Sequence, residues 1–123
     1  MAARIGRVLL YVKDIEKSVE FYCKIFGFED RREEGDRIVE LVCPDGGPTI
    51  ALHQAGKGLK QGQVLVKLVF DVDDVEQFCK QALEKGLEFG PIHKGANYAY
   101  ANAKDPSKNS ISISSKAFRK SID

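Results

Sequence analysis

The stretch RVLLYVKD, residues 7–14, decides the fold, because the chain repeats its pattern as KLVFDVDD at residues 67–74. Each copy has a basic residue, five mostly apolar residues and a charged pair that ends in an acid. The copies are in register, since Arg7 and Lys67 are 60 positions apart (67 − 7), as are Asp14 and Asp74 (74 − 14). A repeat at this period indicates a duplicated structural unit. The sequence therefore predicts two similar modules.

An amphipathic helix is predicted after each copy. In DIEKSVEFYCKIFGF, from Asp14, apolar residues recur at i, i+4, i+7, i+8 and i+11, and DVEQFCKQALEKGLEF, from Asp74, has a similar period. Asp14 and Asp74 are placed to act as N-caps, accepting hydrogen bonds from the first helical turn. Gly27 and Gly86 are placed to end the helices in the left-handed conformation.

Three strand-like stretches follow each helix, separated by turns rich in Gly, Pro and Asp. In order along the chain they are FEDRRE, RIVELVC, TIALHQ, LEFGPIHKG, NYAYANAK and SISISS. We therefore expect an α+β fold with two βαβββ modules in tandem, whose curved mixed sheets enclose a shared cavity, with the modules paired either within one chain or across a dimer. Module one spans about 4–54, a linker 55–63, module two about 64–115 and a C-terminal tail 116–123, within a single domain of residues 1–123.

Composition narrows the function classes. The 19 Lys and Arg residues nearly balance the 18 Asp and Glu residues, so we expect no nucleic-acid partner. No stretch approaches the roughly 18 apolar residues that span a bilayer, and no signal peptide is evident, so we expect no membrane partner and a cytoplasmic location. The cysteines Cys23, Cys43 and Cys79 have no metal-ligand spacing and are interpreted as small core residues.

Alternation within the strands predicts which side chains face away from the helices. The helix-facing sets are Val8, Leu10 and Val12 in the first strand and Leu68, Phe70 and Val72 in its repeat. The opposite, more polar face is expected to line the cavity, where a ligand binds. The candidate substrate-binding residues are Arg7, Tyr11, His53, Lys67, Asp71, Tyr100 and Ser112. The pattern does not fix the facing of NYAYANAK, which would add Tyr98 and Asn102.

These features together resemble the vicinal oxygen chelate superfamily, which includes glyoxalase I, the extradiol dioxygenases, fosfomycin-resistance enzymes and bleomycin-resistance proteins. The resemblance covers roughly residues 4–115. It rests on the paired modules, on VKDIEKSVEFYCKIFGFE and VDDVEQF at matching points of the two modules, and on DPSKNSISI near the end. It implies a ligand site on the polar strand faces and, because members with two modules in a chain of this size dimerise, a homodimer.

Metal-using members of the superfamily carry a His or another ligand at the start of each module's first strand and a Glu on each last strand. The resemblance places these four positions at Arg7, Ala51, Lys67 and Ser112. Arg and Lys are poor ligands because they stay protonated, Ala has no donor atom and a lone Ser hydroxyl binds weakly. We therefore expect no cofactor and no divalent metal, with two cations in place of the metal. The alternative is a site rebuilt around His53 with Glu40 or His93.

The polar face favours a small organic ligand that is anionic or aromatic. Arg7 suits a carboxylate or phosphate, Lys67 adds a point charge, and the tyrosines can stack on a ring. An alternative interpretation, in which these side chains stabilise the fold and bind no ligand, stays open. In that interpretation Arg7 pairs with Asp71 or Glu40, Lys67 reaches water, and the tyrosines pack on the strands.

Three functions follow, in order of preference. The first is a metal-free binding protein similar to the bleomycin-resistance branch. The second is a lyase, isomerase or dioxygenase, with either a rebuilt metal site or metal-free acid–base catalysis by the candidate catalytic residues His53, Tyr11 and Glu40. The third is a non-catalytic structural or interaction module that has kept the fold and lost the pocket.

Overall fold

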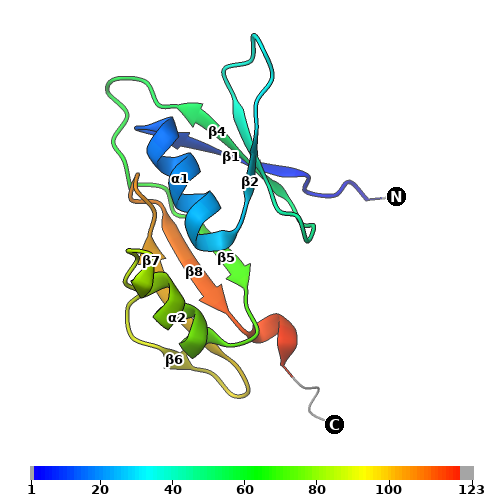
Figure 1. Cartoon of the computed structure of the whole chain (residues 1–123), viewed down its shortest axis with the longest axis vertical. Helices are drawn as coiled ribbons and strands as arrows, with labels where there is room; N and C mark the ends of the chain where they lie inside the picture. The colour runs from blue at the N-terminus through cyan, green and yellow to red at the C-terminus, as the bar shows by residue number, and fades with distance from the viewer. Residues whose placement is uncertain (1, 120–123) are drawn as a thin grey trace. The chain divides into compact units, whose positions relative to one another are not determined.

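The chain folds into two compact units, Met1–Gln61 and Gly62–Asp123, which divide inside the predicted linker. The computed structural model describes residues 2–119 (Figure 1). Each unit has a strand, a helix and three further strands in that order. The predicted order of elements is therefore confirmed in both modules.

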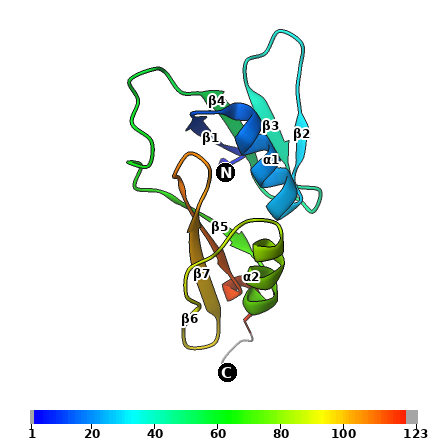
Figure 2. The same cartoon turned by 60° about the vertical axis from the view of Figure 1, so that its left-hand side comes forward.

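Module one contains five elements. They are β1 (Arg7–Val12), α1 (Ile15–Phe26), β2 (Glu29–Arg31), β3 (Val39–Val42) and β4 (Thr49–Gln54). The sheet has the order β1-β4-β3-β2, with β1 parallel to β4 and the other neighbours antiparallel. Helix α1 contacts β2, β3 and β4 and covers one face of this sheet (Figures 1 and 2).

Module two repeats this arrangement. Its elements are β5 (Lys67–Asp71), α2 (Val75–Glu84), β6 (His93–Lys94), β7 (Ala99–Lys104) and β8 (Ser110–Ser114), followed by a 3₁₀ turn, η1 (Lys116–Phe118). The sheet order is β5-β8-β7-β6, again with one parallel pair, β5 and β8. The α+β class and the two mixed sheets are confirmed, and neither sheet closes on itself. The cavity enclosed by the two sheets stays a prediction.

Both helices begin at the predicted caps. Asp14 Oδ1 accepts a hydrogen bond from the backbone N–H of Lys17 (3.1 Å), and Asp74 Oδ1 accepts one from Gln77 (3.0 Å). Gly27 ends α1 with φ +76°. The end of α2 differs slightly from the prediction, because Lys85 caps the helix and the left-handed Gly86, φ +98°, follows it.

The predicted strand LEFGPIHKG is wrong over most of its length, since only His93–Lys94 pairs as β6. Pro91 has no N–H to donate to a ladder, which interrupts pairing before His93. Gly90 N–H still donates to the carbonyl of Asn102 (2.9 Å), so the segment runs beside β7. The predicted tail begins with the 3₁₀ turn η1, Lys116–Phe118. Its last residues, 120–123, lie outside the described part of the chain.

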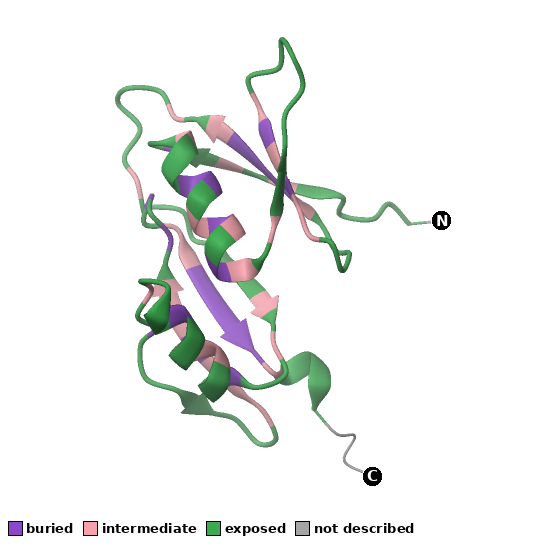
Figure 3. Ribbon diagram, in the orientation of Figure 1, coloured by how far each residue is buried: buried purple, intermediate pink, exposed green. Residues whose placement is uncertain are grey.

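The core of each module lies between its helix and one sheet face (Figure 3). The buried side chains include Val12, Val19, Tyr22, Leu41 and Leu52 in module one and Val75, Ala82, Ala101, Ile111 and Ile113 in module two. Strands β1 and β5 alternate between more exposed and less exposed residues, with the predicted sets facing the helices. Neither helix within residues 2–119 has the length and apolar character needed to cross a membrane.

Candidate functional site

The face of the first sheet that points away from α1 collects the predicted site residues of module one. Residues that pair directly across strands lie on the same face of a sheet. Arg7 pairs with Thr49 and Tyr11 with His53, while Ala51 pairs with both Leu9 and Glu40. We call this surface the polar face of module one, and define it as Arg7, Leu9, Tyr11, Arg31, Glu40, Thr49, Ala51 and His53.

An ion cluster centred on Glu40 occupies this face. Glu40 Oε1 accepts a hydrogen bond from Arg31 Nη2 at 3.0 Å, and Glu40 Oε2 lies 3.9 Å from Arg7 Nη2. The Glu40 side chain is 22% exposed, whereas Arg7 is 68% exposed. Arg7 is on β1 and Glu40 is on β3, with β4 between them. The β4 residue Ala51 has only a methyl side chain, which leaves room for Arg7 to reach Glu40 across β4. One carboxylate therefore neutralises two guanidinium groups only in part.

Tyr11 and His53 form an aromatic pair beside the cluster. Their ring centroids are 5.3 Å apart, with an angle of 57° between the ring planes. His53 Nδ1 lies 2.9 Å from the backbone carbonyl of Gln54. A carbonyl oxygen only accepts, so this contact assigns the proton of the neutral ring to Nδ1 and leaves Nε2 as a proton acceptor. His53 can thus accept a hydrogen bond or a proton from a ligand.

The second sheet presents an equivalent face. Lys67 pairs with Ser110, Val69 with Ser112 and Asp71 with Ser114. The β7 residues Lys104, Asn102 and Tyr100 pair with the same three serines, and His93 pairs with Tyr100. We call this surface the polar face of module two, and define it as Lys67, Val69, Asp71, His93, Tyr100, Asn102, Lys104, Ser110, Ser112 and Ser114.

The lysines of this face bind neutral acceptors. Lys67 Nζ donates to Asn102 Oδ1 at 2.9 Å, and Lys104 Nζ donates to Ser110 Oγ at 2.8 Å. Ser112 is 3% exposed, and its hydroxyl donates to the backbone carbonyl of Ala101 at 3.0 Å. The Ser112 hydroxyl is therefore already engaged within the sheet.

Aromatic rings gather at the other end of the same face. The rings of His93 and Tyr100 stack with centroids 5.0 Å apart and planes 29° apart. Tyr98 lies 6.4 Å from Tyr100, and the Lys116 ammonium lies 5.4 Å from the centre of the Tyr98 ring. Asp71 belongs to the same cross-strand row as Tyr100, through Ser114.

The structure settles several contacts that the sequence left open. Arg7 pairs with Glu40, one of the two partners considered for it, and Lys67 contacts Asn102. The sequence pattern did not fix which side chains of NYAYANAK face away from α2. In the structure Tyr100 and Asn102 lie on the polar face of module two. The signal was present in AYANAK, because small alanines alternate with larger polar residues and the middle one, Ala101, is fully buried. The same alternation places Lys104 on this face, although Lys104 was not among the predicted site residues.

The four positions that the resemblance assigns to metal ligands have side chains that do not suit a metal ion. Ala51 and Ser112 are equivalent, since each pairs with the third residue of its module's first strand. Ala51 has no donor atom, and the protonated Arg7 and Lys67 have no lone pair to give. Within residues 2–119, no group of three His, Cys, Asp or Glu side chains is arranged to hold a metal ion.

The two helical cysteines lack the properties of nucleophiles. Burial, followed by the charge of Asp30, raises the pKa of the Cys23 thiol above its ordinary value. Burial also raises the pKa of Cys79. The reactive thiolate form is therefore disfavoured at both positions.

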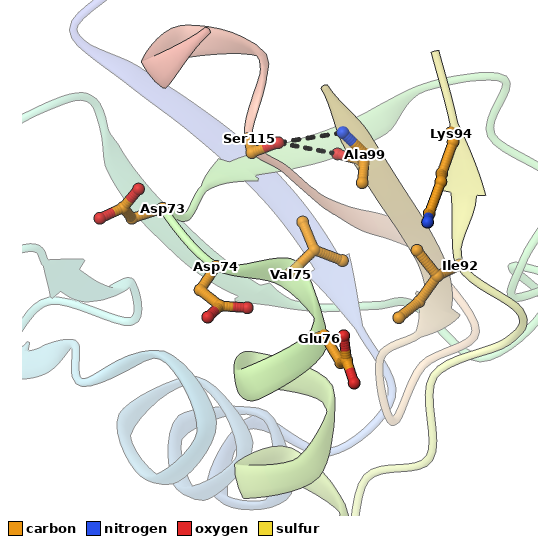
Figure 4. Close-up of a pocket in the computed structure, with 8 residues that line it drawn as sticks. All are labelled: Asp73, Asp74, Val75, Glu76, Ile92, Lys94, Ala99 and Ser115. Carbon is orange, nitrogen blue, oxygen red and sulfur yellow. Dashed lines mark hydrogen bonds between the residues drawn. The ribbon is translucent and has the colours of Figure 1, made fainter. Parts of the chain in front are cut away.

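A separate pocket of about 450 Å³ lies at the start of α2 (Figure 4). It is lined by Asp73, Asp74, Val75, Glu76, Ile92, Lys94, Ala99 and Ser115. Ser115 Oγ accepts a hydrogen bond from the Ala99 N–H at 3.0 Å, and the Asp74 carboxylate caps the helix, so these groups serve the local structure. None of the predicted site residues lines this pocket.

Comparisons with known proteins agree with this geometry. TnmS3, described as an antibiotic binding protein from Streptomyces sp. CB03234, has a TM-score of 0.75 at 21% identity over 91% of this chain and 94% of its own. Lactoylglutathione lyase from Agrobacterium tumefaciens has a TM-score of 0.72 at 20% identity over 92% and 93%. A superfamily member from Sphaerobacter thermophilus DSM 20745 has a TM-score of 0.74 at 22% identity over 92% and 97%.

At these identities the three structures show a shared fold alone. No curated protein sequence matches the chain. The family described as the Glyoxalase/Bleomycin resistance protein/Dioxygenase superfamily matches residues 4–113, which is most of the chain. Together with the two βαβββ modules, this match shows that the chain belongs to the Glyoxalase/Bleomycin resistance protein/Dioxygenase superfamily.

Proposed function

We propose that this chain is a metal-free binding protein for a small organic ligand that is anionic or aromatic. The observation that carries the proposal is the contact between Lys67 and Asn102, in which a neutral acceptor holds the ammonium and leaves its charge uncompensated. Both cations stand at positions that the resemblance assigns to metal ligands; Lys67 is hydrogen bonded to Asn102 on the third strand of its sheet, and Arg7 lies 3.9 Å from Glu40 on the third strand of the other sheet. A directed cation on a strand face is suited to bind a carboxylate or phosphate.

The aromatic pairs support the same proposal. Tyr11 with His53, and Tyr100 with His93, place a ring pair on each polar face. Such rings bind planar ligands through offset or edge-to-face contacts. The fold shared with TnmS3, an antibiotic binding protein, fits a binding role without chemistry on the ligand. We also propose a homodimer in the cytoplasm, as the resemblance and the composition led us to expect.

Binding is tested with a library of aromatic carboxylates, aryl phosphates and neutral aromatic compounds, using thermal shift and then isothermal titration calorimetry. Arg7→Ala and Lys67→Ala are expected to fold and to weaken binding. Lys17→Ala, which removes a lysine from the exposed side of α1, is the matched control and should bind as the wild type does. Full affinity in both test variants would place the binding site elsewhere on the protein.

The metal-free part is tested separately. Elemental mass spectrometry of untagged protein, purified without added metal or chelator, should find only substoichiometric metal. Treatment with a chelator should leave ligand affinity unchanged. One metal ion per chain, or loss of binding after chelation, would contradict this part and direct attention to His53 and its neighbours.

An enzyme of the same superfamily is the second candidate. Its support is the contact between His53 Nδ1 and Gln54, which leaves Nε2 free to act as a base next to Tyr11. Turnover of a compound found in the library screen would be followed by mass spectrometry. His53→Ala should abolish that turnover, and undiminished turnover in the variant would count against His53 as the base.

A further inference from the structure

We propose that module two is the half of the protein that selects ligands carrying a negative charge. In this proposal its polar face binds a ring-bearing ligand with one oxyanion group, a phosphate, sulfonate or carboxylate, held by Lys67 and Lys104. The ring lies against Tyr100 and His93. The inference rests on the proposed binding function and specifies which surface recognises which part of the ligand.

The anion end of the site consists of two lysines on either side of one strand. Lys67 on β5 and Lys104 on β7 both pair with Ser110 on β8, so the three side chains form one row on one face. Each ammonium makes one hydrogen bond to a neutral group, Asn102 for Lys67 and Ser110 for Lys104. An ammonium has three donors, so each lysine keeps two for a ligand.

No carboxylate neutralises these lysines in the part of the chain that the structure describes, since neither forms an ion pair there. Module one differs at the equivalent place. Glu40 pairs with Ala51 as Asn102 pairs with Ser112, and its carboxylate contacts both Arg7 and Arg31. An anion arriving at module one must compete with Glu40, whereas an anion at module two meets two uncompensated charges. The neutral Asn102 therefore distinguishes module two.

The ring end lies close to the anion end. Tyr100 and Asn102 are two residues apart on β7, a spacing of about 7 Å at the usual rise of a strand. Lys67 is held at Asn102, so its ammonium is roughly one such spacing from the stacked Tyr100 and His93 rings. A ligand whose ring and oxyanion are joined by a short linker spans the distance to Lys67, and Lys104, four residues from Tyr100 or about 13 Å along β7, is the outer of the two charges that attract the oxyanion.

Asp71 makes the site directional. It lies in the row of Tyr100, at the opposite end of β5 from Lys67. Its carboxylate repels a second anionic group at the ring end and can accept a hydrogen bond from a ring hydroxyl or amine. We therefore expect a ligand with one anionic end and a neutral or donor-bearing ring.

The experiment compares two probes that differ only in charge, phenethyl phosphate and phenethyl alcohol, by isothermal titration calorimetry at low salt. The measured quantity is the ratio of the two affinities. We expect the wild type to prefer the phosphate, and Lys104→Met to reduce this preference about tenfold, the usual effect of one charge-assisted hydrogen bond. Lys85→Met, a lysine at the end of α2, should leave the ratio unchanged. Tyr100→Leu should weaken both probes equally and leave the ratio unchanged.

Three results would overturn the inference. They are an unchanged ratio in Lys104→Met, a larger loss of preference in Arg7→Met than in Lys104→Met, and equal wild-type affinity for the two probes. The proposed function is judged by the broader library. If neutral library compounds bind and no oxyanion compound does, the binding function stands and the charge selection by module two is wrong. If no compound in either set binds, both are wrong.

Discussion

Replacing Glu40 by Gln should turn module one into a second anion site. Glu40 is the only carboxylate that contacts Arg7 or Arg31 among the ion pairs within residues 2–119. Gln has nearly the same shape and can still accept hydrogen bonds from Arg31, so the cluster should keep its geometry while losing its negative charge. The polar face of module one would then present two uncompensated guanidinium groups, as module two presents two ammonium groups.

The distance between Arg7 and Glu40 sets the size of the effect. Two unit charges 3.9 Å apart attract each other by about 1 kcal/mol in water, from Coulomb's law with a dielectric constant near 80. The water value applies because the Arg7 side chain is 68% exposed, and exposed pairs are measured at about 1 kcal/mol or less. Removing this competition should strengthen binding of a phosphate ligand to the polar face of module one about fivefold.

Titration calorimetry with phenethyl phosphate at low salt measures the change. Glu20→Gln is the matched control, because it removes the same charge from the exposed side of α1 and leaves Arg7 and Glu40 paired. The gain should shrink as salt is added, since exposed charges are screened. Equal gains in Glu40→Gln and Glu20→Gln would refute the reasoning, because the effect would then come from net charge alone.

Three further predictions concern stability. Leu52→Ala should lower the free energy of unfolding in urea by about 2–5 kcal/mol, because Leu52 is fully buried under α1; a loss below 1 kcal/mol would contradict that packing. Gly27→Ala should cost about 1 kcal/mol, since φ is +76° there and no atom obstructs the added methyl, so a stabilised variant would contradict the left-handed cap. The hydrogen bonds from Arg32 lower the pKa of Glu16, so their stabilising effect is complete above the ordinary value of 4.5 and disappears as pH falls through the lower folded pKa. The difference in melting temperature between wild type and Glu16→Gln should therefore vanish at acidic pH, and a constant difference would argue against the ion pair.

The helices and first strands could be predicted from the sequence because their signals are local. Asp14 and Asp74 each stand immediately before an apolar periodic stretch, and an Asp side chain there accepts the N–H three residues on. β6 could not be predicted with the same success. Its stretch has enough apolar residues for a strand, but pairing depends on which N–H groups meet a neighbour, and Pro91 removes one.

The sequence predicted which sheet face carries the candidate site residues, but it did not predict which of their side chains contact one another. Alternation placed Arg7, Tyr11 and Lys67 on the side away from the helices, and the pairing of the strands agrees. The contact between Lys67 and Asn102 depends on the register of β7 against β8, which the turn between them sets. Non-local register of this kind leaves no mark in a window of neighbouring residues, so the contact between Lys67 and Asn102 could not be predicted, although the alternation in AYANAK indicates that Asn102 and Lys104 share a face.

The repeated segments, residues 7–14 and 67–74, have the same backbone structure in both modules, but the cation at the start of each contacts a different acceptor. In each module a cation on the first strand reaches across the last strand to an acceptor on the third, past a small residue, Ala51 or Ser112. The strand geometry explains why the arrangement recurs, since equivalent pairings bring equivalent side chains together. The acceptor then decides the electrostatics, because a Glu partly compensates the charge of its cation and a neutral Asn only orients it. One exchange between Glu40 and Asn102 would therefore be expected to exchange the anion preference of the two modules, and the reciprocal variant Asn102→Glu should abolish the preference for phosphate in module two.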